Sequence, residues 1–298
     1  MTIDFHADDF GLFQSQSERI IQCHTEGALS GISVLTNGDS LQECLALIRP
    51  IAKDLLIAVH LNFLQGHSLS HQTDVNLLTD ENGIFNISFG KLLVVSYSTS
   101  RNAYKQQLKK EIRAQISVLQ PFLREYGKQL RIDGHAHWHM IPVMFDALME
   151  VIREDGLDVE YIRFPSEPFF VMLKNLIRIV PFHPVNVIKT VVLQLLASRN
   201  RRKYHRELMN LEQRLFTGVL LSGYFSYEKT AAILPDLQKA AVLSGQGIEL
   251  LAHPGFVLEK EDIVKITNKQ DAAFFTNSAR QTESEMLKKI KVFQDSKY

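Results

Sequence analysis

The chain has 298 residues, of which 45% are hydrophobic and 22% charged, a balance typical of a globular protein with a sizeable core. Its 33 basic and 33 acidic residues give a formal net charge of zero, so we expect no nucleic-acid partner from overall charge. Cys23 and Cys44 are too few for a disulfide framework and form no CxxC pair, which fits a reducing, cytoplasmic compartment. We expect neither a secretory signal nor a membrane-spanning helix, because no apolar run reaches about 18 residues.

Patterns typical of strands and helices alternate along the chain. Apolar, β-rich runs predict strands, and apolar residues at helical spacing, often followed by a glycine, predict helices. In chain order, the predicted elements are a strand at 2–6, a helix at 14–27, a strand at 31–36, a helix at 40–53, a strand at 55–61, a loop-rich stretch at 65–90, a helix at 103–127, a strand at 130–135, a helix at 142–156, strands at 158–164 and 247–253, and a helix at 278–292. This alternation favours an α/β fold with parallel strands.

Residues 169–215 interrupt the alternation. This segment is apolar and basic, and Pro181 and Pro184 divide it, which predicts two helices joined by a proline-containing turn. One interpretation is an ordinary helical insertion that packs on the rest of the domain. The other is a surface that contacts a membrane or a lipid, because a basic amphipathic helix can lie in the membrane interface. The second interpretation would make a cytoplasmic protein membrane-associated.

Polar residues with ligand or acid–base chemistry follow several of the predicted strands. In a barrel of parallel strands, the carboxyl ends of the strands meet at one face, where active sites lie. A single histidine at a strand end is more often structural, but several strand ends of this kind together indicate a functional site. The residues are Asp8, Asp9, His60, His135, His137, His139, Arg163 and His253.

The stretch "HAHWH" contains three histidines at every second position. On an extended chain, His135, His137 and His139 project to one face. Because neutral imidazole is the commonest metal ligand, one or more of them could bind a metal while the others bind substrate. Asp133 could orient one of the histidines, as carboxylates often do for metal ligands. The alternative is a polar strand end with partly exposed histidines.

Five motifs occur in order between residues 6 and 255: "HADDFG", "VHLN", "DGHAHWHMIP", "YIRFPSE" and "LLAHPG". With these motifs the chain resembles the YdjC-like carbohydrate deacetylases, the group that contains chitooligosaccharide deacetylase and the hopanoid-associated deacetylase-like proteins. The resemblance implies a single domain over 1–298 with an irregular, TIM-barrel-like (β/α) barrel that includes the insertion at 169–215. It also implies one divalent metal ion, Mg or Zn, and hydrolysis of the N-acetyl group of an amino sugar.

The resemblance assigns roles to individual residues. The implied metal ligands are Asp9, His60 and His135. Asp8 resembles the general base, Arg163 the arginine that holds this base, and His253 the general acid. The residues that we expect to bind substrate are Phe10, Asn62, His137, His139 and Glu167.

Two departures from the family pattern matter for the substrate. His6 stands where family members more often have Asn or Thr, so position 6 could contact substrate or simply pack. The insertion at 169–215 is larger than a minimal member needs, so the acetylated sugar could be a free oligosaccharide or a lipid-linked one. Related proteins often pair as dimers, which makes a homodimer one expectation.

Amide hydrolysis needs an activated water, a polarised carbonyl and a proton for the leaving amine. A metal with open coordination positions supplies the first two, and an imidazolium can supply the third. Two other functions stay open on sequence grounds. One is a metal-dependent phosphoesterase, which would more typically need bridging ligands for two metals. The other is a non-catalytic carbohydrate-binding relative that keeps the fold.

Overall fold

A computed structural model describes residues 2–257, 273 and 275–295. In it, seven strands form one sheet in the order β5–β4–β3–β2–β1–β7–β6, and every neighbouring pair is parallel. The strands are β1 (Ile3–Phe10), β2 (Gly31–Val34), β3 (Leu56–Leu61), β4 (Leu130–Gly134), β5 (Val159–Ile162), β6 (Arg214–Thr217) and β7 (Gly247–Ala252). The predicted α/β fold with parallel strands is therefore confirmed.

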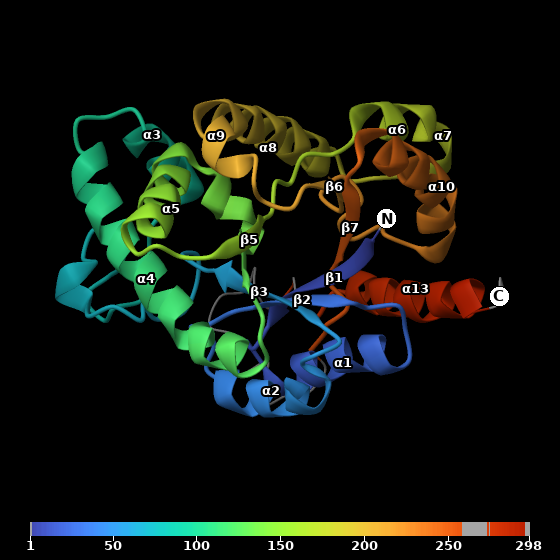
Figure 1. Ribbon diagram of the computed structural model, residues 1–298, viewed down its shortest axis with the longest axis horizontal. Helices are drawn as coiled ribbons and strands as arrows, with labels where there is room; N and C mark the ends of the chain where they lie inside the picture. The colour runs from blue at the N-terminus through green and yellow to red at the C-terminus, as the bar shows by residue number, and fades with distance from the viewer. Residues whose placement is uncertain (1, 258–272, 274, 296–298) are drawn as a thin grey trace.

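The sheet curls into a half-barrel with helices on its outside (Figure 1). Its two edges approach each other, because the backbone N–H of Glu212, just before β6, donates to the carbonyl of Glu160 in β5 at 2.8 Å. Among the described residues, no ladder of strand pairing joins β5 to β6. The sheet is thus an open version of the barrel that the family resemblance implied.

Helices cover the outer face of the sheet. α1, α2 and α13 lie along one side of it, α4 and α5 along another, and α8 and α10 cover the edge with β6 and β7 (Figure 1). The helices are α1 (Gln14–Thr25), α2 (Leu41–Ile48), α3 (Phe89–Val95), α4 (Arg101–Glu125), α5 (Pro142–Glu154), α6 (Phe169–Lys174), α7 (Leu176–Ile179), α8 (Pro184–Lys203), α9 (His205–Leu208), α10 (Tyr227–Ser244) and α13 (Ser278–Asp295), with short 3-10 turns η1 (Arg49–Ile51), η2 (Gln72–Asp74) and η3 (His135–Met140). No helix in the described part of the chain has the length and apolar character needed to cross a bilayer.

The segment at 169–215 differs from the prediction in detail. It forms four helices, α6 to α9, where two were predicted, and its last two residues already belong to β6. Strand β6 was missed because its four residues, "RLFT", are too few to show a strand period. Helix α10, which follows, was also not predicted.

The inner face of the half-barrel is polar. Along β1, Asp4, His6 and Asp8 point inward and are almost fully buried, whereas Phe5 and Ala7 between them pack into the hydrophobic core under the helices. The side chains alternate with period two, as in any strand. Here the charged side chains face the inside of the barrel, and the apolar ones face the helices outside it. The interior is therefore a network of ion pairs and hydrogen bonds that leads to the carboxyl ends of the strands.

A second buried charge, Asp146 on α5, ties the insertion to the domain. Its carboxylate lies beside Arg101 of α4 and also binds Arg199, Lys203 and Tyr204. Burial raises the pKa of Asp146, but these partners outweigh burial and hold it well below its usual range. We expect Asp146→Asn to lower the free energy of unfolding by about 2–3 kcal/mol at pH 7, because it removes a buried charge from its partners.

The pH dependence follows from the direction of this pKa shift. Because the folded-state pKa lies below the unfolded one, the contribution of Asp146 is fully present above the unfolded pKa and declines as pH falls toward the folded one. Urea unfolding at pH 7 and pH 3 should show that the difference between wild type and Asp146→Asn shrinks at pH 3. Glu125→Gln, which breaks a half-exposed pair with Arg49, serves as the control with little effect. An equal difference at both pH values would contradict this account.

Candidate active site

Asp8 and Asp9 end β1 at an irregularity. The register of β1 against β2 shifts between Ala7 and Phe10, and Asp9 has a φ of 69°, in the left-handed region that few non-glycine residues adopt. Such a bulge re-aims a side chain, so two neighbours that would point to opposite faces of a regular strand can face one point. Both carboxylates approach Nε2 of His60, Asp9 at 3.6 Å and Asp8 at 3.8 Å.

Asp9, His60 and His135 come together at this point from β1, β3 and η3. Nδ1 of His135 lies 2.8 Å from Oδ1 of Asp9, and one ligand atom from each of the three residues lies within 4.8 Å of the others. All three side chains are buried. Burial raises the pKa of Asp9, but His135, His60 and Arg280 outweigh it and hold the pKa well below its usual range. Asp9 is therefore an anion at neutral pH.

The chemistry of this cluster fits a divalent cation. Nδ1 of His60 hydrogen-bonds Oδ1 of Asp133 at 2.6 Å, while its Nε2 is buried and has no hydrogen-bond partner in the described structure. A carboxylate on one ring nitrogen is the usual way to orient a histidine whose other nitrogen binds metal. Burial lowers the pKa of His60, but the charges of Asp8 and Asp133 outweigh it and raise the pKa to about 10, so the site favours positive charge.

Two other buried groups of acids and histidines lie nearby, and both include His6. Nδ1 of His6 bonds Oδ2 of Asp4 at 3.0 Å, and its Nε2 bonds the hydroxyl of Ser33 at 2.8 Å. Neither ring nitrogen is left for a metal. His6 therefore packs within the polar interior, and the position that departs from the family pattern has a structural explanation.

Arg163 organises the carboxylates around the cluster. Its side chain is fully buried, and its Nη1 donates to both oxygens of Asp8, at 2.8 and 2.9 Å. The same guanidinium lies 2.8 Å from Asp133, and its Nε donates to Glu249 at 2.5 Å. A planar guanidinium carries several N–H donors and so suits contacts with more than one carboxylate. The contact between Arg163 and Asp8 is the one that the sequence led us to expect.

A cleft of about 500 Å³ adjoins the cluster. His253 and Arg280 line it, and Nη2 of Arg280 donates to Oδ2 of Asp9 at 3.0 Å, which joins the cleft to the candidate metal site. The backbone N–H of His253 donates to Glu283 at 2.5 Å, and Nδ1 of its ring lies 3.7 Å from the same carboxylate oxygen. A partly exposed imidazole and a carboxylate thus line a cleft that Arg280 connects to the candidate metal site.

A family model described as "YdjC-like protein" matches residues 2–297, nearly the whole chain. The chain belongs to the YdjC-like family. The resemblance based on the five motifs is confirmed.

Curated relatives of this YdjC-like chain are named carbohydrate deacetylase. One from Danio rerio is 26% identical over 162 residues, which are 54% of this chain and 49% of that protein. One from Vibrio cholerae is 26% identical over 170 residues, 57% of this chain and 62% of that protein. One from Clostridium beijerinckii is 22% identical over 254 residues, 84% of this chain and 98% of that protein. The match therefore spans only about half to three-fifths of the first two relatives.

A solved structure is similar over almost the full YdjC-like chain. It is a protein of Enterococcus faecalis named for cellobiose-phosphate cleavage, with a TM-score of 0.65 and 18% identity, covering 99% of this chain and 94% of that one. At this level of identity the likeness concerns the fold.

The prediction that His135, His137 and His139 share one face of an extended chain is wrong. They form the 3-10 stretch η3, in which Ala136 and His137 have φ values of 50° and 61°. These left-handed residues turn the backbone directly after β4, so the alternation of a strand does not apply. Only the first of the three histidines belongs to the candidate metal cluster.

The last of these histidines has a structural role in the YdjC-like fold. Nε2 of His139 donates to the backbone carbonyl of Arg163 at 2.9 Å, and burial lowers its pKa to about 4. Gly134 makes room for it, because a Cβ at this position would lie 2.9 Å from the His139 ring. His139 is fully buried and so has no surface for a sugar, contrary to expectation. His137 packs against Phe216, and its Nδ1 has no hydrogen-bond partner among the described residues, so it stays a candidate for substrate binding.

Of the other three residues expected to bind substrate, one lies in the hydrophobic core and two hold loops at the ends of strands. Phe10 is fully buried in the hydrophobic core, so the expectation that it meets a sugar is wrong. Oδ1 of Asn62 accepts the backbone N–H groups of 64–65 and shapes the loop after β3. Oε1 of Glu167 accepts the N–H groups of 218–220 and shapes the loop after β6. Both side chains are buried, and their role in binding remains a proposal.

Sequence reasoning missed three acidic or basic groups around the site. Glu249 could have been recognised from the sequence, because it is a charged residue within the apolar run "GIELLA" of β7. Arg280 and Glu283 could not have been recognised, because they lie on α13, whose first turns have the sequence pattern of an ordinary surface helix. Their roles depend on contacts with β1 and β7 that only the folded chain creates.

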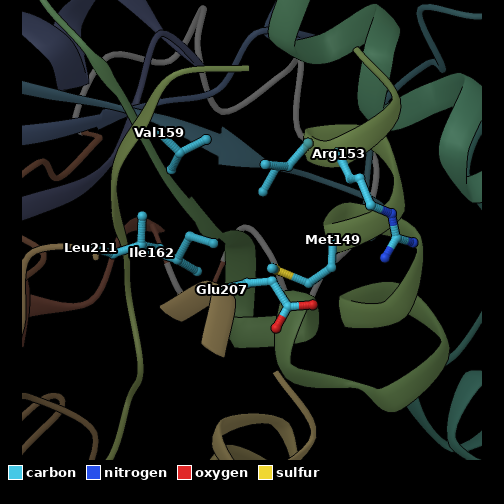
Figure 2. A pocket seen from close by; sticks show the side chains of 7 residues that line it. Met149, Arg153, Val159, Ile162, Glu207 and Leu211 are labelled. Carbon is cyan, nitrogen blue, oxygen red and sulfur yellow. The ribbon is translucent and has the colours of Figure 1, made fainter. Parts of the chain in front are cut away.

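A smaller cavity of about 190 Å³ lies apart from these residues, between α5, β5 and the segment that precedes β6 (Figure 2). Met149, Val159, Ile162 and Leu211 give it an apolar wall, and Glu207 is the one acid in its lining. With no histidine or cysteine in that lining, we assign no chemistry to it.

Proposed function

We propose that this YdjC-like chain is a metal-dependent hydrolase that removes an N-acetyl group from an amino sugar. The observation that carries the proposal is the convergence of Asp9, His60 and His135, with Asp8 as a spare carboxylate beside them. The names of the curated relatives support an acetylated carbohydrate as the substrate class. A free oligosaccharide and a lipid-linked sugar both belong to that class.

The three clustered residues would hold one divalent ion, Mg or Zn. When bound, such an ion lowers the pKa of a water molecule and polarises the acetyl carbonyl. Asp8 accepts the proton of the attacking water. Arg163 holds the Asp8 carboxylate in one orientation through its two hydrogen bonds. Asp133 holds the ring of His60, so that Nε2 stays directed at the cluster.

His253 donates a proton to the departing amine from the cleft side. Glu283 lies 3.7 Å from its Nδ1, beside the imidazole to which we assign this role. Arg280 fixes Asp9 from the opposite oxygen to the one near His135. In this proposal Asp8 is the base and is held by Arg163, His253 is the acid and lies beside Glu283, and Asp9 is a metal ligand held by Arg280.

An acetate-release assay with N-acetylated oligosaccharides tests the proposal. We expect the purified protein to release acetate, a chelator to abolish the release, and added Mg or Zn to restore it. The chelator should also lower the unfolding temperature, because an ion that binds only the folded state stabilises it. Phosphate release from phosphorylated sugars is measured in parallel. Phosphate release without acetate release would contradict the proposal and favour the phosphoesterase.

A further inference from the structure

An exposed apolar surface, here called the α6–α8 face, covers α6, α7 and the outer side of α8. Its largest exposed side chains are Phe169, Phe170, Ile177, Ile188, Val191 and Leu195. Phe170 is 83% exposed and Ile177 is 91% exposed. The three helices follow one margin of the molecule, at the top of the view in Figure 1. Large exposed apolar side chains that gather on one segment of a folded chain indicate an interaction site.

Helix α8 is apolar on two opposite sides. Leu193 and Ala197 pack inward, whereas Ile188, Val191 and Leu195 are spaced three and four residues apart and share the exposed side. A helix that met only water on its outer side would carry polar residues there. The exposed stripe is therefore suited to a partner that removes it from water.

The same segment is strongly basic. Between residues 169 and 206 there are eight lysines and arginines and no aspartate or glutamate, although the whole chain has zero net charge. Arg178, Arg202 and Arg206 are exposed and have no acidic partner in the described structure. The partner of this face must therefore be both apolar and anionic. A second copy of the chain does not fit, because two such faces brought together would repel each other.

The α6–α8 face borders the candidate active site. His183, Asn186 and Lys189, at the start of α8, line the cleft together with His253 and Arg280. Asn186 also anchors the helix by donating to the carbonyls of 220 and 222. A surface that contacts this face would therefore lie at the side of the cleft.

We propose that the α6–α8 face docks on the surface of a bilayer that contains anionic lipids. The apolar side chains enter the boundary between headgroups and acyl chains, and the arginines bind the lipid headgroups. Because the cleft adjoins the face, its substrate is an acetylated amino sugar displayed by that membrane. This last step rests on the proposed function, whereas docking itself does not.

Vesicle flotation tests the docking. We expect the protein to float with vesicles of phosphatidylcholine and phosphatidylglycerol but not with vesicles of phosphatidylcholine alone, and added salt should weaken the association. Ile177→Ser should lower the partition coefficient about tenfold, because it removes one large apolar side chain from the contact. Arg178→Gln and Arg202→Gln should each lower it about fivefold.

Leu243→Ser is the matched control. Leu243 is 80% exposed and lies close to the end of α10, just before β7 begins, at the amino ends of the strands. This variant should bind vesicles like wild type, and all variants should keep the wild-type unfolding temperature.

Three results would overturn the docking proposal. They are no association with anionic vesicles, a loss of vesicle binding in Leu243→Ser equal to that in Ile177→Ser, or a dimer in solution that Ile177→Ser dissociates while vesicles do not bind.

Acetate release from a soluble oligosaccharide separates the docking proposal from the proposed function. We expect Ile177→Ser and Arg178→Gln to leave it unchanged. Vesicle binding by a protein that releases acetate from no sugar would support docking and reject the proposed function.

Discussion

Asp9→Asn and His60→Ala are expected to abolish both metal binding and acetate release. His60→Ala removes Nε2, which lies 3.6 Å from Oδ1 of Asp9, and Asp9→Asn removes the negative charge of that carboxylate. A site left with two ligands, or without the negative charge of Asp9, holds a divalent ion poorly. We expect acetate release to fall by at least about three orders of magnitude. Elemental analysis of the purified proteins, alongside the acetate assay, measures both effects.

Asp8→Asn is the matched control, since it makes the same chemical change one residue earlier. We expect it to keep the metal and to slow acetate release by about 10²–10⁴-fold, the usual loss when a general base is removed. Metal analysis that finds Asp8→Asn empty, or Asp9→Asn fully loaded, would show that the two carboxylates do not have the roles proposed for them.

Arg163→Met is expected to have the largest effect on stability. The fully buried guanidinium contacts Asp8, Asp133 and Glu249, and its loss leaves three buried carboxylates without their cation. Breaking a buried charge cluster in this way costs about 3–5 kcal/mol of unfolding free energy. Urea unfolding at pH 7 measures the loss. Arg163→Lys, which keeps one charge but not the planar donor geometry, should lose less.

The loss in Arg163→Met should depend on pH. Burial raises the pKa of Asp133, and in the wild type the charges of Arg163 and His60 outweigh burial and hold it well below its usual range. Without the arginine, the Asp133 carboxylate takes up a proton more readily in the folded state, so lowering the pH from neutrality should reduce the destabilisation. Arg49→Met, at a half-exposed surface pair, should change stability little at any pH. A Met variant as stable as wild type would refute the buried-cluster account.

The sequence could predict the features that depend on local periodicity. Strands of apolar residues followed by Asp9, His60 and Arg163 predicted an α/β fold in which these residues lie at one end of a parallel sheet. The structure brings them there because parallel neighbours keep their carboxyl ends together. Helices α4 and α5 could also be predicted from the sequence, because each has an apolar stripe and a glycine after its last turn.

The parts that could not be predicted depend on backbone irregularity or on distant contacts. The left-handed φ values at Asp9 and His137 interrupt the strand alternation, and nothing in "HADDF" or "HAHWH" marks where the interruption falls. Arg280 contacts Asp9 across 271 residues of sequence, and no local pattern carries such information. Strand β6 is too short for its period to show.

The position of β1 in the sheet has a consequence for protein synthesis. β1 pairs with β2 on one side and with β7 on the other. The ladder between β1 and β7, in which Ile3 pairs with Ile248, can therefore form only after β7 has been synthesised. A growing polypeptide carries Asp9, His60 and His135 well before His253 and Arg280 have left the ribosome. Because chains begin to fold as they emerge, the proposed metal ligands are present before the proposed proton donor is. Under the proposed function, His253 and Arg280 therefore complete the site only after its proposed metal ligands have been translated.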